Sequence, residues 1–129
     1  MKTPFIPISW GELFDKITIL QIKLENLKDK NALKNVKIEY EKLNSIFNEF
    51  FFENTIANQL IIDLKLINEK LWNIEDLIRD KERNKVFNKE FIELARKVYI
   101  TNDKRSRIKR KINETFGSEL VEEKSYADY

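Results

Sequence analysis

The sequence predicts an all-α protein, an antiparallel up-down helical bundle of about four long helices with an extended N-terminal strap and a C-terminal tail. Apolar residues recur at helical spacing over long stretches. Both prolines and both glycines lie near the chain ends, at Pro4, Pro7, Gly11 and Gly117, so no helix breaker divides the middle. A chain of 129 residues, 42% of them hydrophobic, is long enough for one domain. We therefore expect a single helical domain over 1–129, with the strap at 1–8, the bundle at 9–116 and the tail at 117–129.

The first helix begins after a capping signal. Ser9 and Glu12 fit a capping box, in which each side chain bonds the backbone N–H of the other residue. One apolar stripe follows at Leu13, Ile17, Leu20, Leu24 and Leu27, and a second apolar face lies opposite it at Ile19 and Ile22. A helix with two apolar faces is usually sandwiched between neighbours. Asp15 and Thr18 share the second face, so we expect them to be polar groups in a covered place.

Three more helices are expected to follow. The second spans roughly 32–52 and the third roughly 56–82, each with an apolar seam at helical spacing. Asn88 can cap the fourth helix, which runs to about Thr115, and Gly117 suits its C-cap. Short connections favour antiparallel neighbours. The second faces of the first and third helices leave apolar surface that a homodimer would cover, including Ile61, Ile62, Leu66 and Trp72.

The composition excludes several kinds of chemistry. The chain has no cysteine and no histidine, so it lacks the usual zinc ligands, a thiolate nucleophile and an imidazole base. Helical nucleotide pyrophosphohydrolases carry an E-x-x-E helix followed by an E-x-x-D helix. The acidic pairs here, Glu12 with Asp15 and Glu90 with Glu93, occur in reversed order and far apart. The sequence therefore predicts no metal site and no cofactor.

Charge and hydropathy bear on location and partners. No apolar run is long enough to span a membrane, and the N-terminus lacks a secretion signal, so we expect no membrane and a cytoplasmic location. The net charge is +2, and a basic run at 104–111 precedes an acidic tail. These two segments are expected to pair with each other. Nucleic-acid binding is not expected, because the basic run has no interleaved aromatic residues.

Polar residues interrupt the apolar line of the fourth helix. Asn102 falls between the inward-facing Val98 and Ile108, with Arg105 close to it. The pair either fixes helix register through a buried hydrogen bond or ion pair, or lines a polar pocket inside the bundle.

The last two helices each carry a polar and aromatic flank, one at Trp72, Glu75, Asp76 and Arg79, the other at Arg96, Tyr99, Asp103 and Arg110. If the two flanks face each other, they form an Arg-rich, aromatic-walled cleft that suits a phosphorylated or carboxylated ligand. The alternative for Glu75 and Arg79 is a salt bridge on the surface of one helix.

Two parts of the sequence resemble a known family. The first part is PISWGELFDKITILQIKLENL at 7–27. The second part, nearer the end, consists of three segments: LWNIEDLIRDKE at 71–82, FIELARKVYITNDKRSRIKRKIN at 91–113 and GSELVEEKSYADY at 117–129. These segments are similar to a family of short bacterial proteins described as a domain of unknown function, with members beside glycosyltransferase and surface-polysaccharide genes and in some phages. The resemblance implies that the tail is ordered or binds something. It also matches polar residues at Ser9, Glu12, Asp15, Lys16, Thr18, Arg79, Arg96, Asn102, Asp103 and Arg105.

Two functions from different classes follow as hypotheses. The first is a non-enzymatic helical module that binds a partner protein or an anionic ligand, and the resemblance implies a link to surface-glycan assembly. Its ligand-binding candidates are the ten matched residues together with Trp72, Asp76 and Tyr99. The alternative is a small enzyme that uses carboxylates and Mg²⁺ to act on a nucleotide or sugar phosphate. The tail is also expected to return along the bundle and to seat its apolar side chains on the second faces of the first and third helices.

Overall fold

The computed structural model describes residues 1–129 and contains four α-helices and no strand. The helices are α1 (Trp10–Asn26), α2 (Lys30–Phe51), α3 (Thr55–Arg83) and α4 (Lys89–Thr115). The prediction of an all-α helical bundle is confirmed. Each helix starts at a polar side chain that accepts a hydrogen bond from the backbone N–H three residues later, at Ser9, Asp29, Asn54 and Asn88. Local capping chemistry therefore sets all four N-termini.

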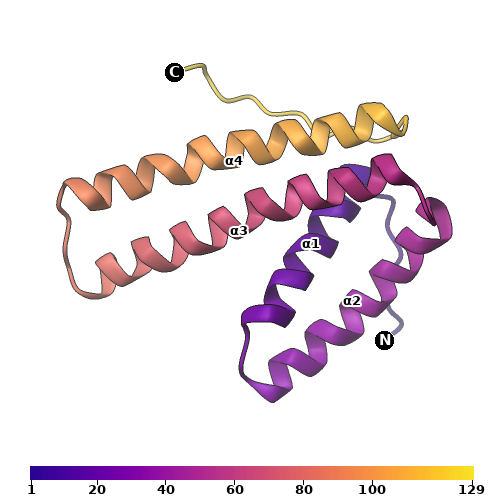
Figure 1. The fold of residues 1–129 in the computed structure, drawn as a ribbon, viewed down its shortest axis with the longest axis horizontal. Coiled ribbons are helices and arrows are strands. Elements are labelled where there is room, and N and C mark those ends of the chain that lie inside the picture. The colour runs from indigo at the N-terminus through magenta and orange to yellow at the C-terminus, as the bar shows by residue number, and fades with distance from the viewer.

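The four helices form two antiparallel hairpins (Figure 1). The α1–α2 hairpin crosses one end of the α3–α4 hairpin at a steep angle, and the other end of the α3–α4 hairpin extends beyond it. Helix α1 packs against all three other helices, whereas α2 packs mainly against α1. This position explains why α1 needs two covered faces, as its sequence predicts.

The hydrophobic core lies where the two hairpins meet. Phe14 of α1 is fully buried, and its ring makes edge contacts with Phe47 and Phe51 of α2, with centroids 5.1 and 5.2 Å away. Leu64 of α3 and Ile112 of α4 are also fully buried in this cluster. Burial of a side chain of this size contributes about 1.5–3 kcal/mol each. The core therefore holds the crossing point of the hairpins in place.

The tail returns along α4 after a reversal at Gly117. Gly117 has a φ of +60°, and the N–H of Ser118 donates to the carbonyl of Asn113 at 2.8 Å, which closes the end of the helix. The tail then runs beside α4 (Figure 1). Its leucine and valine, Leu120 and Val121, are 43% and 40% exposed. Ion pairs join this part of the tail to α4, and the seating of its apolar side chains on the second faces of α1 and α3 stays a prediction.

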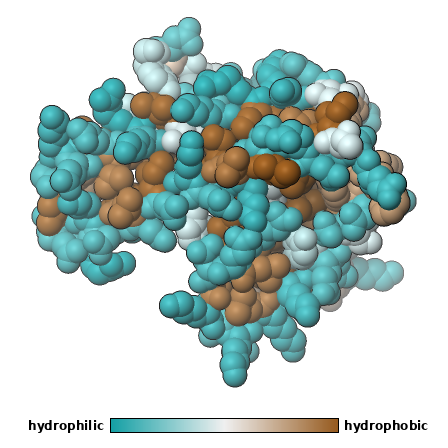
Figure 2. Space-filling model, in the orientation of Figure 1, coloured by the Kyte–Doolittle hydropathy of each residue, from teal (hydrophilic) through white to brown (hydrophobic).

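Apolar residues remain on the surface in several places. Figure 2 shows apolar patches over both hairpins on an otherwise hydrophilic face. Ile62 and Leu66 on the second face of α3 are 52% and 54% exposed. The homodimer expected from this face stays a prediction. None of the helices combines the length and the apolar character needed to cross a membrane.

Candidate functional site

A buried polar network joins α1, α3 and α4. The carboxylate of Asp15, which is 2% exposed, accepts hydrogen bonds from Nε of Arg105 at 2.9 Å, from Nη2 of the same residue and from Nδ2 of Asn68 at 2.9 Å. The same Nδ2 donates to Oγ1 of Thr18 at 2.8 Å, and that hydroxyl donates to the carbonyl of Asp15. Asp15 and Thr18 are thus covered polar groups, as their place on the helix predicted. The charge of Asp15 is balanced by a bidentate guanidinium.

Arg105 lies between this buried network and the solvent-accessible surface. Two of its five N–H groups bond Asp15, and a third, on Nη1, bonds Oδ1 of Asn102 at 3.2 Å. The hydrogen bonds to Asp15 raise the pKa of the guanidinium, although burial alone would lower it. The side chain is still 26% exposed. One N–H on each of Nη1 and Nη2 is therefore left for another partner.

Lys109 lies one helical turn beyond Arg105 and is also buried. Its ammonium group is 2.9 Å from Glu12, 3.2 Å from Glu122 of the tail and 3.8 Å from Asp15. Burial alone would lower its pKa, but the hydrogen bond to Glu12 and the charge of Asp15 outweigh burial and raise it. The expected pairing of the basic run with the acidic tail occurs here and between Arg110 and Glu123.

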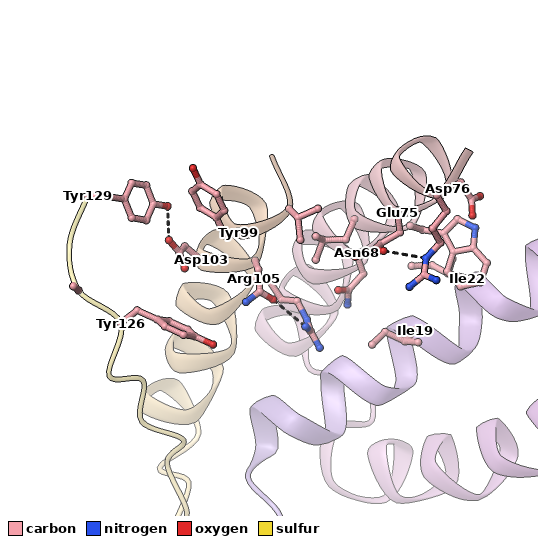
Figure 3. A pocket seen from close by; sticks show the side chains of 16 residues that line it. Ile19, Ile22, Asn68, Glu75, Asp76, Tyr99, Asp103, Arg105, Tyr126 and Tyr129 are labelled. Carbon is pink, nitrogen blue, oxygen red and sulfur yellow. Dashed lines mark hydrogen bonds and ion pairs between the residues drawn. The ribbon is translucent and has the colours of Figure 1, made fainter. Parts of the chain in front are cut away.

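A cleft of about 830 Å³ opens beside this network, lined by sixteen residues from α1, α3, α4 and the tail. Its volume is in the range of small-molecule sites. Figure 3 shows Ile19 and Ile22 on α1, Tyr126 and Tyr129 on the tail, and Arg105 with Asn68 between them. Further apolar and aromatic walls come from both helices of the second hairpin, at Leu71, Trp72, Val98 and Tyr99.

The lining is less basic than the sequence suggested. The α3 flank faces only half of the α4 flank across the cleft, at Tyr99 and Asp103, because Arg110 pairs with Glu123 outside the lining. The only guanidinium groups in the lining are those of Arg79 and Arg105. Arg79 is bonded to Glu75 at 3.2 Å and Arg105 to Asp15. Arg96 is exposed and lies outside the lining. The cleft is therefore walled mainly by aromatic and apolar side chains, and its arginines are already paired.

The other residues predicted for the site lie partly in the cleft and partly outside it. Trp72, Asp76, Asn102 and Asp103 line the cleft. Ser9 caps α1, as predicted from the capping box. Glu12 pairs with Lys109, and Lys16 is an exposed neighbour whose ammonium lies 3.8 Å from Glu12. No three or more acidic side chains come together in a way that could hold a metal ion.

Sequence reasoning missed two residues of the network, Asn68 and Lys109. A signal existed for Asn68, because it follows Leu64 by one helical turn on the apolar stripe of α3 and is 5% exposed. Lys109 follows Arg105 by one turn and was interpreted only as part of the basic run. In both cases the helical spacing indicates that the residue lies on the same face of its helix as a buried or network residue.

Close contact between α1 and α4 fixes the geometry of the network. The N–H of Gly11 donates to Oδ1 of Asn113 at 2.7 Å, and the N–H of Trp10 donates to Oγ of Ser118 at 3.2 Å. A Cβ on Gly11 would lie 2.6 Å from the carbonyl oxygen of Lys109. Only glycine allows the two backbones to approach this closely, which brings Asp15 within reach of Arg105.

Comparisons with known proteins agree with the resemblance in the sequence. Searches of curated proteins and of solved structures gave no match. A family model with the description "Family of unknown function (DUF6165)" matches residues 4–129, which span the strap, all four helices and the tail. The chain therefore belongs to this family of unknown function.

Proposed function

We propose that this protein is a binding module whose cleft between α1, α3 and α4 holds a small organic ligand through one anionic group, a carboxylate or a phosphate. The observation that carries the proposal is the state of Arg105. Asp15 fixes its guanidinium in one orientation, and two N–H groups remain at the cleft. A guanidinium that is already immobilised loses little conformational freedom when it binds a carboxylate or phosphate.

Two amides beside Arg105 support the same proposal. Neither Nδ2 of Asn102 nor Oδ1 of Asn68 has a hydrogen-bond partner in the protein, whereas every buried side-chain nitrogen and oxygen has one. Both atoms are therefore accessible, and both residues line the cleft. The floor of the cleft thus offers a charged donor, a neutral donor and an acceptor, the small set of polar groups that orients a ligand in an apolar site.

The charge balance limits how anionic the ligand can be. The lining contains the carboxylates of Glu75, Asp76 and Asp103 against the guanidinium groups of Arg79 and Arg105. A ligand with several anionic groups would be repelled by this lining. The proposal is therefore for a single anionic group on a largely apolar or aromatic body. The Mg²⁺-dependent enzyme considered from the sequence has no comparable observation in its favour.

The proposed setting is the bacterial cytoplasm. The possible link to surface-polysaccharide assembly rests on the resemblance to family members alone. A protein partner for the exposed apolar patches is a separate proposal, with less to support it than the cleft.

Titration calorimetry of the full chain tests the proposal with two pairs of probes, phenyl phosphate against phenol and benzoate against benzyl alcohol. We expect each anion to bind at least tenfold more tightly than its uncharged counterpart. Asn102→Asp keeps the acceptor for Arg105 but replaces the free donor with a negative oxygen, so it should abolish anion binding. Arg105→Lys should weaken binding at least tenfold, because lysine lacks the fork.

Arg96→Lys is the matched control, since Arg96 is an exposed arginine of the same helix outside the cleft. It should leave the affinity for phenyl phosphate unchanged. Equal affinity for the charged and uncharged probes, or full anion binding by a folded Asn102→Asp variant, would refute the proposal.

A further inference from the structure

The outer part of the cleft combines aromatic rings with carboxylates. The rings of Tyr99 on α4 and Tyr129 on the tail meet edge to face, with centroids 5.3 Å apart and planes at 81°. The hydroxyl of Tyr129 donates to the carboxylate of Asp103, one helical turn from Tyr99 (Figure 3). Two perpendicular rings with an adjacent carboxylate form a corner of the kind that binds ammonium groups through cation–π attraction.

The opposite wall has the same composition. Trp72 and Asp76 are one turn apart on α3, and Glu75 lies beside them. Glu75 pairs with Arg79, while Asp76 takes part in no ion pair within the protein. The outer part of the cleft thus has three carboxylates, with Asp103 included, against one guanidinium. Its aromatic residues are unusually accessible, since Tyr126 and Tyr129 are 72% and 79% exposed. A ligand that covers such exposed rings removes a large apolar area from water, which favours binding.

The floor of the cleft also offers an accessible hydrogen-bond acceptor. The Asn68 side chain is 5% exposed, yet its Oδ1 has no partner in the protein and opens to the cleft. Every buried side-chain oxygen of the protein has a partner, so this oxygen is open to the cleft, where water or a ligand group can donate to it.

We propose that the cleft takes a zwitterion, whose anionic group binds Arg105 and Asn102 on the floor and whose ammonium group lies in the aromatic and acidic outer part between Tyr99 and Trp72. The anionic half of this inference rests on the proposed function. The cationic half does not, because it comes from a different set of residues. A zwitterion also accounts for the charge pattern, since it places each of its charges against the opposite one.

The test compares phosphocholine with 3,3-dimethylbutyl phosphate, which has the same shape but a carbon in place of the quaternary nitrogen. Calorimetry on the full chain should give at least tenfold tighter binding of phosphocholine. Asp103→Asn, which still accepts the hydrogen bond from Tyr129, should weaken phosphocholine by about three- to tenfold and leave 3,3-dimethylbutyl phosphate nearly unchanged. Tyr99→Leu, at a position that is 45% exposed and tolerant of substitution, should do the same.

Glu93→Gln removes an exposed carboxylate of α4 outside the cleft and serves as the control, with no expected effect. Equal affinity for the two phosphates would overturn the zwitterion while leaving the proposed function intact. So would binding of phenyl phosphate without any binding of phosphocholine. Failure of every anionic probe would overturn both proposals. If Glu93→Gln weakens phosphocholine binding as much as Asp103→Asn does, the effect of Asp103→Asn comes from the net charge of the protein. That result would overturn the proposed ammonium site.

Discussion

The pairing of Asp15 with Arg105 leads to a quantitative prediction for Asp15→Asn. The substitution keeps the shape of the side chain but removes a charge that is 2% exposed and in contact with Arg105 and Lys109. The amide also places an N–H₂ group against the guanidinium in either orientation, because both oxygens of Asp15 accept from Arg105, so that two donors face each other. Both effects act on the folded state only.

Removal of one partner from a buried ion pair costs about 3–5 kcal/mol. Arg105 is 26% exposed and can regain water from the cleft, so we expect a smaller loss of about 2–4 kcal/mol in the free energy of unfolding. The total free energy of unfolding of a small protein is about 5–15 kcal/mol. The variant should therefore fold, but with a urea midpoint lower by roughly 1–2 M for a slope of about 2 kcal/mol/M.

The assay is urea unfolding at pH 7, followed by circular dichroism. Glu75→Gln makes the same chemical change in an exposed pair, where Arg79 is 74% and Glu75 42% exposed, and should stay within about 0.5 kcal/mol of the wild type. If Asp15→Asn also stays within about 0.5 kcal/mol, the range of ordinary surface changes, the buried network does not stabilise the fold as argued.

Three further outcomes are expected. Gly11→Ala should lower stability by about 1–3 kcal/mol, because its Cβ would meet a backbone carbonyl of α4, whereas Gly117→Ala has open space and should cost about 1–2 kcal/mol through its positive φ alone; a thermal melt of either variant that matches the wild type would contradict this. Hydrogen bonds from two lysines lower the pKa of Glu122, so its stabilisation of the tail should be present above the unfolded value of about 4.3 and be lost as the pH falls through the folded value; hydrogen-exchange protection of the tail that stays constant from pH 6 to pH 3 would exclude that role. The exposed Ile62 and Leu66 favour a homodimer, and a 15.5 kDa monomer in sedimentation equilibrium at micromolar concentration would argue against it.

Local signals in the sequence were enough to locate the helices. Ser9 and Asn88 cap their helices through bonds to residues three positions away, which any reader of the sequence can anticipate. The covered state of Asp15 also followed from its place on the helix. Arg96 and Arg105 show how far such reasoning reaches, because nine residues turn a helix by about 900°, which leaves the two side chains on opposite faces. Tyr99 and Asp103 share the face of Arg96 and yet line the cleft, so helical geometry alone does not decide which residues of α4 reach it.

The crossing of the two hairpins could not be predicted in this way. An apolar stripe identifies the buried face of a helix but not the angle at which a neighbour crosses it. That angle decides which part of α3 and α4 is covered by α1 and which part is left to form the cleft. The path of the tail depends on pairs such as Lys109 with Glu122, and these form only after α4 is in place. Both features arise from tertiary contacts that have no local signature.

The position of Asp15 has a consequence for the order in which the chain can fold. Its hydrogen-bond partners Asn68 and Arg105 lie 53 and 90 residues further along the chain, and Gly11 is held by Asn113, 102 residues away. During synthesis, the α1–α2 hairpin emerges long before these partners do, and it cannot bury an unpaired carboxylate. The face of α1 that carries Asp15 must therefore stay hydrated until Arg105 in α4 has been synthesised. Contacts this distant in sequence slow folding, so the face of α1 that carries Asp15 forms its native contacts later than the face that packs on α2.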